Sequence, residues 1–145
     1  MAKLAGRWIT VTLDDESPAA KDVSSDVDSI DIPMEFDELD ITGFSDAVKN
    51  SMPGLPGFNV ELTGTFNPTA DQLGDVLIGI VGDYATHTLT VAVGANAAPA
   101  MGDPEFEGEF WCPKMQISAS PTGKVVVTAS LRVYGTTAPA WGTVA

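Results

Sequence analysis

Apolar and polar residues alternate with a period of two along much of this chain. In the segment 7–13, Ile9, Val11 and Leu13 share one side, while Trp8 and two threonines occupy the other. This period predicts a half-buried β-strand. The same alternation predicts further strands in the segments 30–36, 58–67, 85–93, 105–118 and 124–134.

Two of these predicted strands contain an irregularity. Pro33 lies inside the segment 30–36 and lacks a backbone N–H, which favours an edge strand or a bulge. In the segment 105–118 the apolar positions change parity near Trp111, which predicts a β-bulge at that point. The turn Pro121-Thr-Gly joins the last two segments, so these are expected to form a hairpin.

One segment has the period of an α-helix instead. Thr69 and Gln72 have the spacing of a capping box, in which each side chain bonds a free backbone N–H of the first turn. An apolar stripe follows and predicts a helix at about residues 69–81. The stripe consists of Leu73, Val76, Leu77 and Ile80.

Together these elements predict a mainly β (α+β) fold, an antiparallel β-sandwich or partly closed barrel with one flanking α-helix. A chain of 145 residues forms about one domain, so residues 1–145 are expected to be a single unit. The expected connections include an extended acidic loop at about 14–27, a short helical turn at 45–50 and a tight turn at 55–57. The uncharged residues 135–145 are expected to form a C-terminal arm.

Acidic residues give the chain a formal net charge of −13. They gather in the regions 14–46 and 103–109, so the charge belongs to particular surfaces. Binding to a nucleic-acid backbone needs clustered lysine and arginine, and the charge argues against it. No stretch of about 20 apolar residues occurs, so no membrane span is expected. The first residues lack the apolar core of a signal peptide, so the chain is expected to stay in the cytoplasm where it is made.

Residues with chemical reactivity are few. His87 is the only histidine and shares the parity of apolar neighbours, which is typical of a structural position. Cys112 is the only cysteine, so no internal disulfide can form, and a buried, inert thiol is expected. The acidic run that starts at Asp26 departs from the EF-hand pattern, which requires glycine where this chain has Asp31. The sequence therefore predicts no catalytic residue, no metal site and no cofactor.

Tryptophan is enriched at the anchors of protein interfaces, and two of the three tryptophans stand apart from the predicted core. Trp8 falls on the polar side of its strand, and Trp141 lies in the uncharged C-terminal arm beside Pro139. Trp8, Trp141 and Pro139 are therefore the candidate interface residues.

The order of the segments resembles the tail tube proteins, or major tail proteins, of tailed bacteriophages. The resemblance covers most of the chain, and it rests on the order of the motifs. The matching runs are Trp8-Ile-Thr-Val-Thr-Leu-Asp-Asp, Asp22-Val-Ser-Ser-Asp-Val-Asp-Ser-Ile, Leu39-Asp-Ile-Thr-Gly-Phe, Phe58-Asn-Val-Glu-Leu-Thr-Gly-Thr-Phe-Asn-Pro and Gly135-Thr-Thr-Ala-Pro-Ala-Trp.

This resemblance implies a structural virion protein with no enzymatic activity. Copies of the chain would form rings, typically of six, that stack into a hollow tail tube through which DNA passes without specific binding. Its partners would be further copies of itself and other phage tail proteins, and its place would be the tail of the virion. An acidic lumen would repel DNA phosphates, and the candidate lumen residues are Asp31, Glu35, Glu105, Glu107 and Glu109, on strand faces opposite apolar ones.

Two alternatives remain open from the residues. A capsid decoration protein, or another head-associated virion protein, would share the lack of chemistry and the virion location. A module that binds carbohydrate or another small ligand, from a different class, would use the exposed tryptophans and the plentiful carboxylates. The oligomeric form of the purified protein discriminates between these readings.

Overall fold

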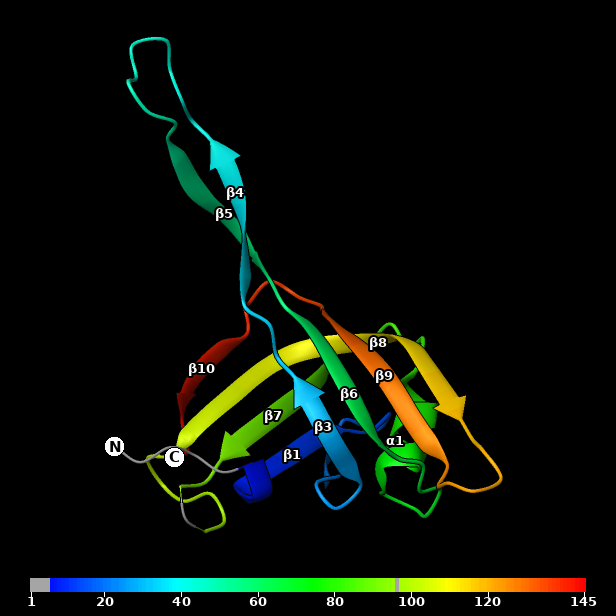
Figure 1. Cartoon of the computed structure of the whole chain (residues 1–145). Helices are drawn as coiled ribbons and strands as arrows, with labels where there is room; N and C mark the ends of the chain where they lie inside the picture. Colours follow the sequence, from blue (N-terminus) through cyan, green and yellow to red (C-terminus); the bar gives the residue numbers. More distant parts are fainter. Residues whose placement is uncertain (1–5, 96) are drawn as a thin grey trace.

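Antiparallel β-strands make up about half of the chain (Figure 1). The structure is a computed structural model that describes residues 6–95 and 97–145. Within these residues the elements are η1 (Gly6–Trp8), β1 (Ile9–Asp14), β2 (Ala20–Asp22), β3 (Val27–Asp31), β4 (Glu35–Asp40), β5 (Ser51–Gly57), β6 (Asn59–Thr65), α1 (Leu73–Ile80), β7 (His87–Val93), β8 (Pro104–Ser118), β9 (Val126–Val133) and β10 (Ala140–Thr143). The prediction of a mainly β fold with one helix is confirmed.

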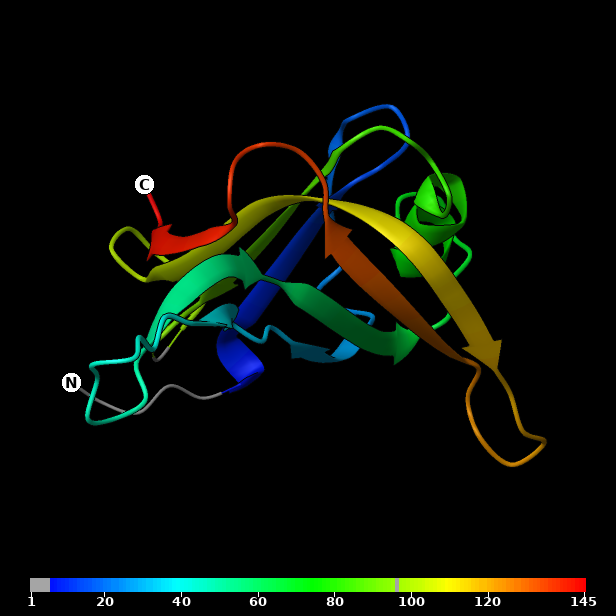
Figure 2. The ribbon, with the colours of Figure 1, turned by 90° about the horizontal axis from the view of Figure 1, so that it is seen from above.

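The body of the molecule is one bent sheet with the strand order β2-β1-β7-β8-β9-β6-β3, and β10 pairs with the first part of β8. The end strands β2 and β3 do not pair, but residues 23–26 cross between them. The Val23 N–H donates to the Val11 carbonyl at 3.0 Å, and the Thr65 N–H donates to the Asp26 carbonyl at 2.7 Å. The segment 23–26 therefore bridges β1 and β6, but the sheet itself does not close into a barrel. From above, the long β8 arches across the body with α1 at one end (Figure 2).

The inward faces of the strands form one hydrophobic core. Phe58, Phe106 and Phe110 lie at its centre, with ring centroids about 6 Å apart along the series. The predicted apolar stripe of α1 is confirmed, because all four of its side chains are at most 1% exposed. Each fully buried Leu, Ile or Phe contributes on the order of 1.5–3 kcal/mol relative to an exposed one.

The helix begins later than predicted, at Leu73 instead of Thr69. The capping box is wrong: Gln72 is the N-cap and makes no side-chain capping bond. Its role is taken by Asp26, whose Oδ2 accepts from the Leu73 N–H at 3.3 Å while Oδ1 accepts from Asn67 Nδ2. A carboxylate 47 residues earlier in the chain satisfies the helix end, and no local pattern could reveal this.

The segment 14–27 is a folded hairpin and not the extended loop that the sequence suggests. Asp15 closes a tight turn by accepting from the N–H groups of Ser17 and Ala19. The chain then returns as β2, with Leu13 opposite Lys21. Val23 is fully buried, so burial of this side chain holds the segment against the body.

The segment 34–57 differs most from expectation. The helical turn predicted at 45–50 and the turn at 55–57 are absent. Instead β4 and β5 pair with each other as a separate two-stranded sheet, with Leu39 opposite Met52 and Phe36 opposite Pro56. This hairpin, residues 35–57, projects from the body and is called the arm below (Figure 1). Cross-strand pairing of the whole segment outweighs the local turn propensities of Ser45 and Pro56.

The other irregular regions lie on β8. Its register against β9 shifts between Trp111 and Lys114, which confirms the predicted bulge. The C-terminal segment 135–145 does not extend away as an arm, because β10 pairs antiparallel with β8, Trp141 opposite Phe106.

Candidate assembly surfaces

The side chains with reactive potential are buried. His87 is 1% exposed on β7, with Nε2 3.3 Å from Asp83 Oδ2. Cys112 is buried on β8, and its desolvation raises the pKa of the thiol, which disfavours the nucleophilic thiolate. No group of three or more His, Cys, Asp or Glu in residues 6–95 and 97–145 is placed to hold a metal ion. In the same part of the chain, no helix is long and apolar enough to cross a membrane.

Three of the candidate lumen residues form a row on the outer face of β8. Glu105, Glu107 and Glu109 alternate with the buried Phe106 and Phe110 and therefore point away from the core. The row stands beside threonines of β7, and Glu109 accepts a hydrogen bond of 2.6 Å from the Thr88 hydroxyl. Alternation along one strand thus places three carboxylates on one polar surface.

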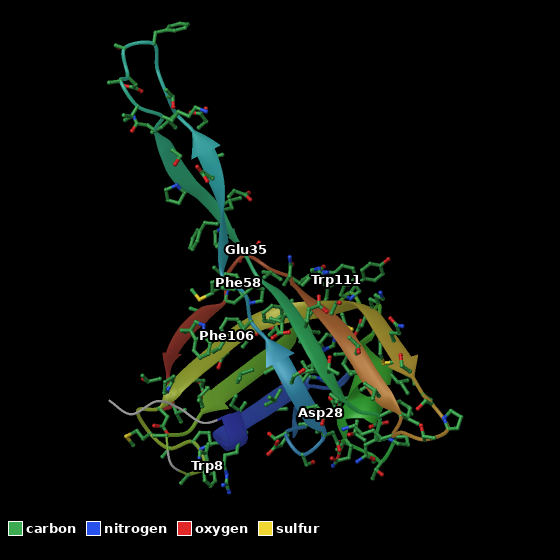
Figure 3. The ribbon with its side chains drawn as sticks, in the orientation of Figure 1. Trp8, Asp28, Glu35, Phe58, Phe106 and Trp111 are labelled. Carbon is green, nitrogen blue, oxygen red and sulfur yellow. The ribbon has the colours of Figure 1, made fainter. Side chains whose placement is uncertain are left out.

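The other two candidate lumen residues lie elsewhere. Asp31 ends β3 and lies opposite Glu61 of β6. The neighbours of Glu61 in its strand are buried, so Glu61 and Asp31 both lie on the outer face of the sheet. Asp31 is three strands away from β8. On the strands between β8 and β3, Arg132 Nη1 lies 3.5 Å from Glu61 Oε1, so the outer face also carries positive charge. Glu35 begins β4 at the base of the arm (Figure 3). The structure brings together the β8 row but not all five acids.

The two candidate interface tryptophans differ in their surroundings. Trp8 ends η1 and is half-buried, with the Arg7 Cζ 4.6 Å from its ring centroid, a cation–π arrangement. Trp141 on β10 is 42% exposed, and its ring lies 5.4 Å from that of Phe106. One side of Trp141 therefore covers the core while the other faces solvent.

Pro139 is buried within the subunit and offers little surface to a neighbour. It packs on Gly108, where a Cβ would come within 2.6 Å of the proline Cβ. The glycine lets the C-terminal segment lie flat on β8, and the proline helps to hold β10 in place. Its observed contact is thus with its own chain.

The arm is the most exposed apolar surface of the molecule, and no interface residue was predicted on it. Every residue of β4 is exposed, and at the tip Phe44 is fully exposed. The exposed large apolar residues of this region are Met34, Phe36, Leu39, Ile41, Phe44, Val48, Met52 and Leu55. An apolar surface of this kind marks an interaction site. The available signal was the mixture of apolar and acidic residues through 36–41, followed by several Gly and Pro residues up to Gly57.

Hydrogen bonds order the tip of the arm. The Asp40 carboxylate accepts from the Thr42 N–H at 2.9 Å, and Asp46 accepts from the Gly43 N–H at 2.7 Å. The Thr42 N–H and hydroxyl lower the pKa of Asp40, and the Gly43 N–H followed by the Asn50 side chain lowers that of Asp46. Both carboxylates are thereby favoured in their charged form.

These surfaces define a class of protein: a mainly β domain with a buried core and a protruding apolar arm. No protein-family model matches the chain, and no curated protein matches its sequence. Among solved structures, the chain is similar to one from the tail of an empty gene transfer agent particle with C6 symmetry, at a TM-score of 0.75 and 15% identity over 99% of this chain and 100% of that one.

Two further similarities point the same way. A chain of the SPP1 tail tube matches with a TM-score of 0.72 and 12% identity, over 97% of this chain and 80% of that one. A chain from the sheath–tube complex of an extracellular contractile injection system matches with a TM-score of 0.68 and 16% identity, over 98% and 93%. The chain therefore has the fold of tail tube proteins.

Proposed function

We propose that this chain is a structural virion protein, the subunit of a phage-type tail tube, with no enzymatic activity. The observation that carries the proposal is the match of almost the whole chain, at a TM-score of 0.75, to a chain of a C6-symmetric tail. The likeness to a second tail tube, SPP1, supports the same role.

The surfaces of the subunit suit such an assembly. A ring requires heterologous contacts, in which one patch of a copy meets a different patch of the next. The arm supplies an apolar patch that its own subunit leaves uncovered. Rings of six copies would stack into a tube, with other tail proteins at its ends.

We further propose that the outer face of β8 contributes to the channel. The row Glu105, Glu107 and Glu109 would present carboxylates to passing DNA, whose phosphates they repel. Asp31, on the same face, would add to this charge. DNA would then slide without binding.

The test is the form of the purified full chain. Electron microscopy and analytical ultracentrifugation should show rings and stacked tubes with a central channel. A protein that remains monomeric at every concentration would contradict the proposal. Labelling of particles with an antibody should mark the tail, whereas labelling of the capsid surface would favour a decoration protein.

A matched variant isolates the role of the arm. Residues 36–56 are replaced by a short Gly-Ser linker, and the body should stay folded because β4 and β5 pair only with each other. The variant should unfold at the same denaturant concentration as the full chain but form no tubes. Normal tubes from this variant would exclude the arm as a required contact.

A further inference from the structure

A polar row crosses the outer face of the sheet, where β8, β9, β6 and β3 run side by side (Figure 1). The strand register places Lys114 opposite Ser130, and Ser130 opposite Glu61. Glu61 in turn lies opposite Asp31. Residues that lie directly opposite each other in antiparallel strands share one face of the sheet. One cation, one hydroxyl and two carboxylates therefore follow one another across four strands.

Glu61 stands within this row and also pairs with a second cation. Its Oε1 lies 3.5 Å from Arg132 Nη1, and its Oε2 accepts a hydrogen bond of 2.8 Å from the Ser130 hydroxyl. Arg132 belongs to the neighbouring row, where it lies opposite Trp111 on one side and Asn59 on the other. The Ser130 hydroxyl thus holds the carboxylate beside the guanidinium.

The outer faces of β3, β6, β8 and β9 carry two cations, Arg132 and Lys114. Within the part of the chain that the structure describes, Lys114 has no carboxylate within ion-pair distance. Adjacent strands are about 4.8 Å apart, so the backbone of Glu61 lies about 10 Å from that of Lys114, which is close to the screening length in about 0.1 M salt. The charge of Glu61 therefore acts on both cations.

An exposed ion pair of this kind contributes little to the stability of a protein. Its effect on the surface potential is larger. In the two rows, Glu61 and Asp31 balance the two cations, so the glutamates of β8 leave the outer face with an excess of negative charge. Without Glu61, two cations would stand beside one carboxylate, and the freed guanidinium matches the geometry of a phosphate group.

We infer that Glu61 keeps the channel face from binding DNA phosphates, because it occupies the guanidinium of Arg132 and lowers the potential around Lys114. This inference rests on the proposed tube function, in which the outer face of the sheet contributes to the channel. Each ring would carry one such ion pair per copy, so the loss of one carboxylate from the chain is repeated around the DNA. The β8 glutamates repel DNA, and Glu61 withholds the cations from it.

Sedimentation of DNA with tubes of the full chain tests the inference. Tubes are mixed at low salt with a short fluorescent DNA duplex, and wild-type tubes should retain little of it. Glu61→Gln keeps the size of the side chain and an acceptor for Ser130, and its tubes should retain several-fold more DNA. Glu107→Gln makes the same change in net charge on the outer face of β8 and should have a much smaller effect. Equal retention by the two variants would overturn the inference.

A second substitution identifies the cation. Adding Arg132→Gln to Glu61→Gln should remove most of the gain in retained DNA. The gain should also disappear as the salt concentration rises, because contacts between cations and phosphates release counterions. A gain that persists after Arg132→Gln is added would overturn the inference.

Ser130→Ala tests the same ion pair without a change in the charge of the chain. Loss of the hydroxyl that holds Glu61 should give a smaller gain in retained DNA than Glu61→Gln. Where Glu61→Gln forms no tubes, Ser130→Ala decides: more retained DNA than in the wild type supports the inference, and no gain overturns it. A wild-type chain that forms no tubes would instead contradict the proposed function.

Discussion

Asp26 connects several elements of the body through its side chain and its backbone carbonyl. It is 8% exposed, and its carboxylate accepts from the first N–H of α1 and from the Asn67 side chain. Its carbonyl accepts from Thr65 and lies so close to Gly64 that a side chain there would collide with it. The residue thus ties β6, the helix and the crossing segment 23–26 together.

Replacing Asp26 by alanine should lower the free energy of unfolding by about 1–2 kcal/mol, because a helix cap is lost and buried donors stay unpaired. Asp26→Asn keeps a side-chain oxygen and should cost less. Asp28→Ala, on the exposed neighbour, controls for the loss of one charge. Urea unfolding measures all three, and equal losses for Asp26→Ala and Asp28→Ala would contradict the role of the cap.

At the scale of elements, the arm has its own stability. Its two strands pair with each other, and hydrogen bonds to the carboxylates of Asp40 and Asp46 order its tip. Packing on the hydrophobic core therefore adds little to the stability of the arm. Elements with few buried contacts open at low free energy. We therefore expect the arm to respond to conditions that leave the body unchanged.

Acid should loosen the tip of the arm before it unfolds the body. Both carboxylates have a pKa below the ordinary 3.8 in the folded arm, so their hydrogen bonds stabilise the tip fully above that value. This stabilisation is lost as the pH falls through the lowered pKa values. The Gly43 amide resonance should titrate with this transition. In Asp46→Asn, which keeps the acceptor but cannot ionise, that titration should vanish; its persistence would contradict the assignment.

The whole molecule carries a charge of −13, which opposes the approach of identical copies. Lysines and arginines are already counted in this value, so the ion pairs of the described residues leave the excess of acids uncompensated. Burial of apolar surface at the arm must exceed this repulsion if tubes form. The balance depends on ionic strength, because salt shortens the range of the repulsion.

Raising the salt concentration from about 0.1 M to about 1 M, which shortens the screening length from about 10 Å to about 3 Å, should lower the protein concentration needed for assembly. Light scattering over a dilution series measures this threshold. The triple variant Glu105→Gln, Glu107→Gln and Glu109→Gln should show a weaker dependence on salt, if the β8 row faces the channel. A threshold that rises with salt in the wild type would contradict dominant repulsion.

Periodicity was a reliable guide where a segment packs on the core. The strands around Val60 and Leu131 and the stripe of α1 follow the predicted positions, since burial of alternate or helically spaced side chains leaves a regular pattern. The parity change near Trp111 also marked a real bulge. The candidate site was less predictable: the β8 glutamates share a face because one strand carries them, but Glu35 and Asp31 are placed by tertiary contacts.

The amino-acid sequence by itself determined the fold class, the core and the acidic character of the protein, because these depend on residue type and local period. Only the tertiary structure decided that 35–57 projects as an arm, that 14–27 and 135–145 fold back on the body, and that Asp26 caps α1. Each of these depends on pairing between segments far apart in the chain or on the lack of a partner. The local propensity of a segment holds no information on long-range pairing or on a missing partner. The candidate assembly surfaces can therefore be identified only from the tertiary structure.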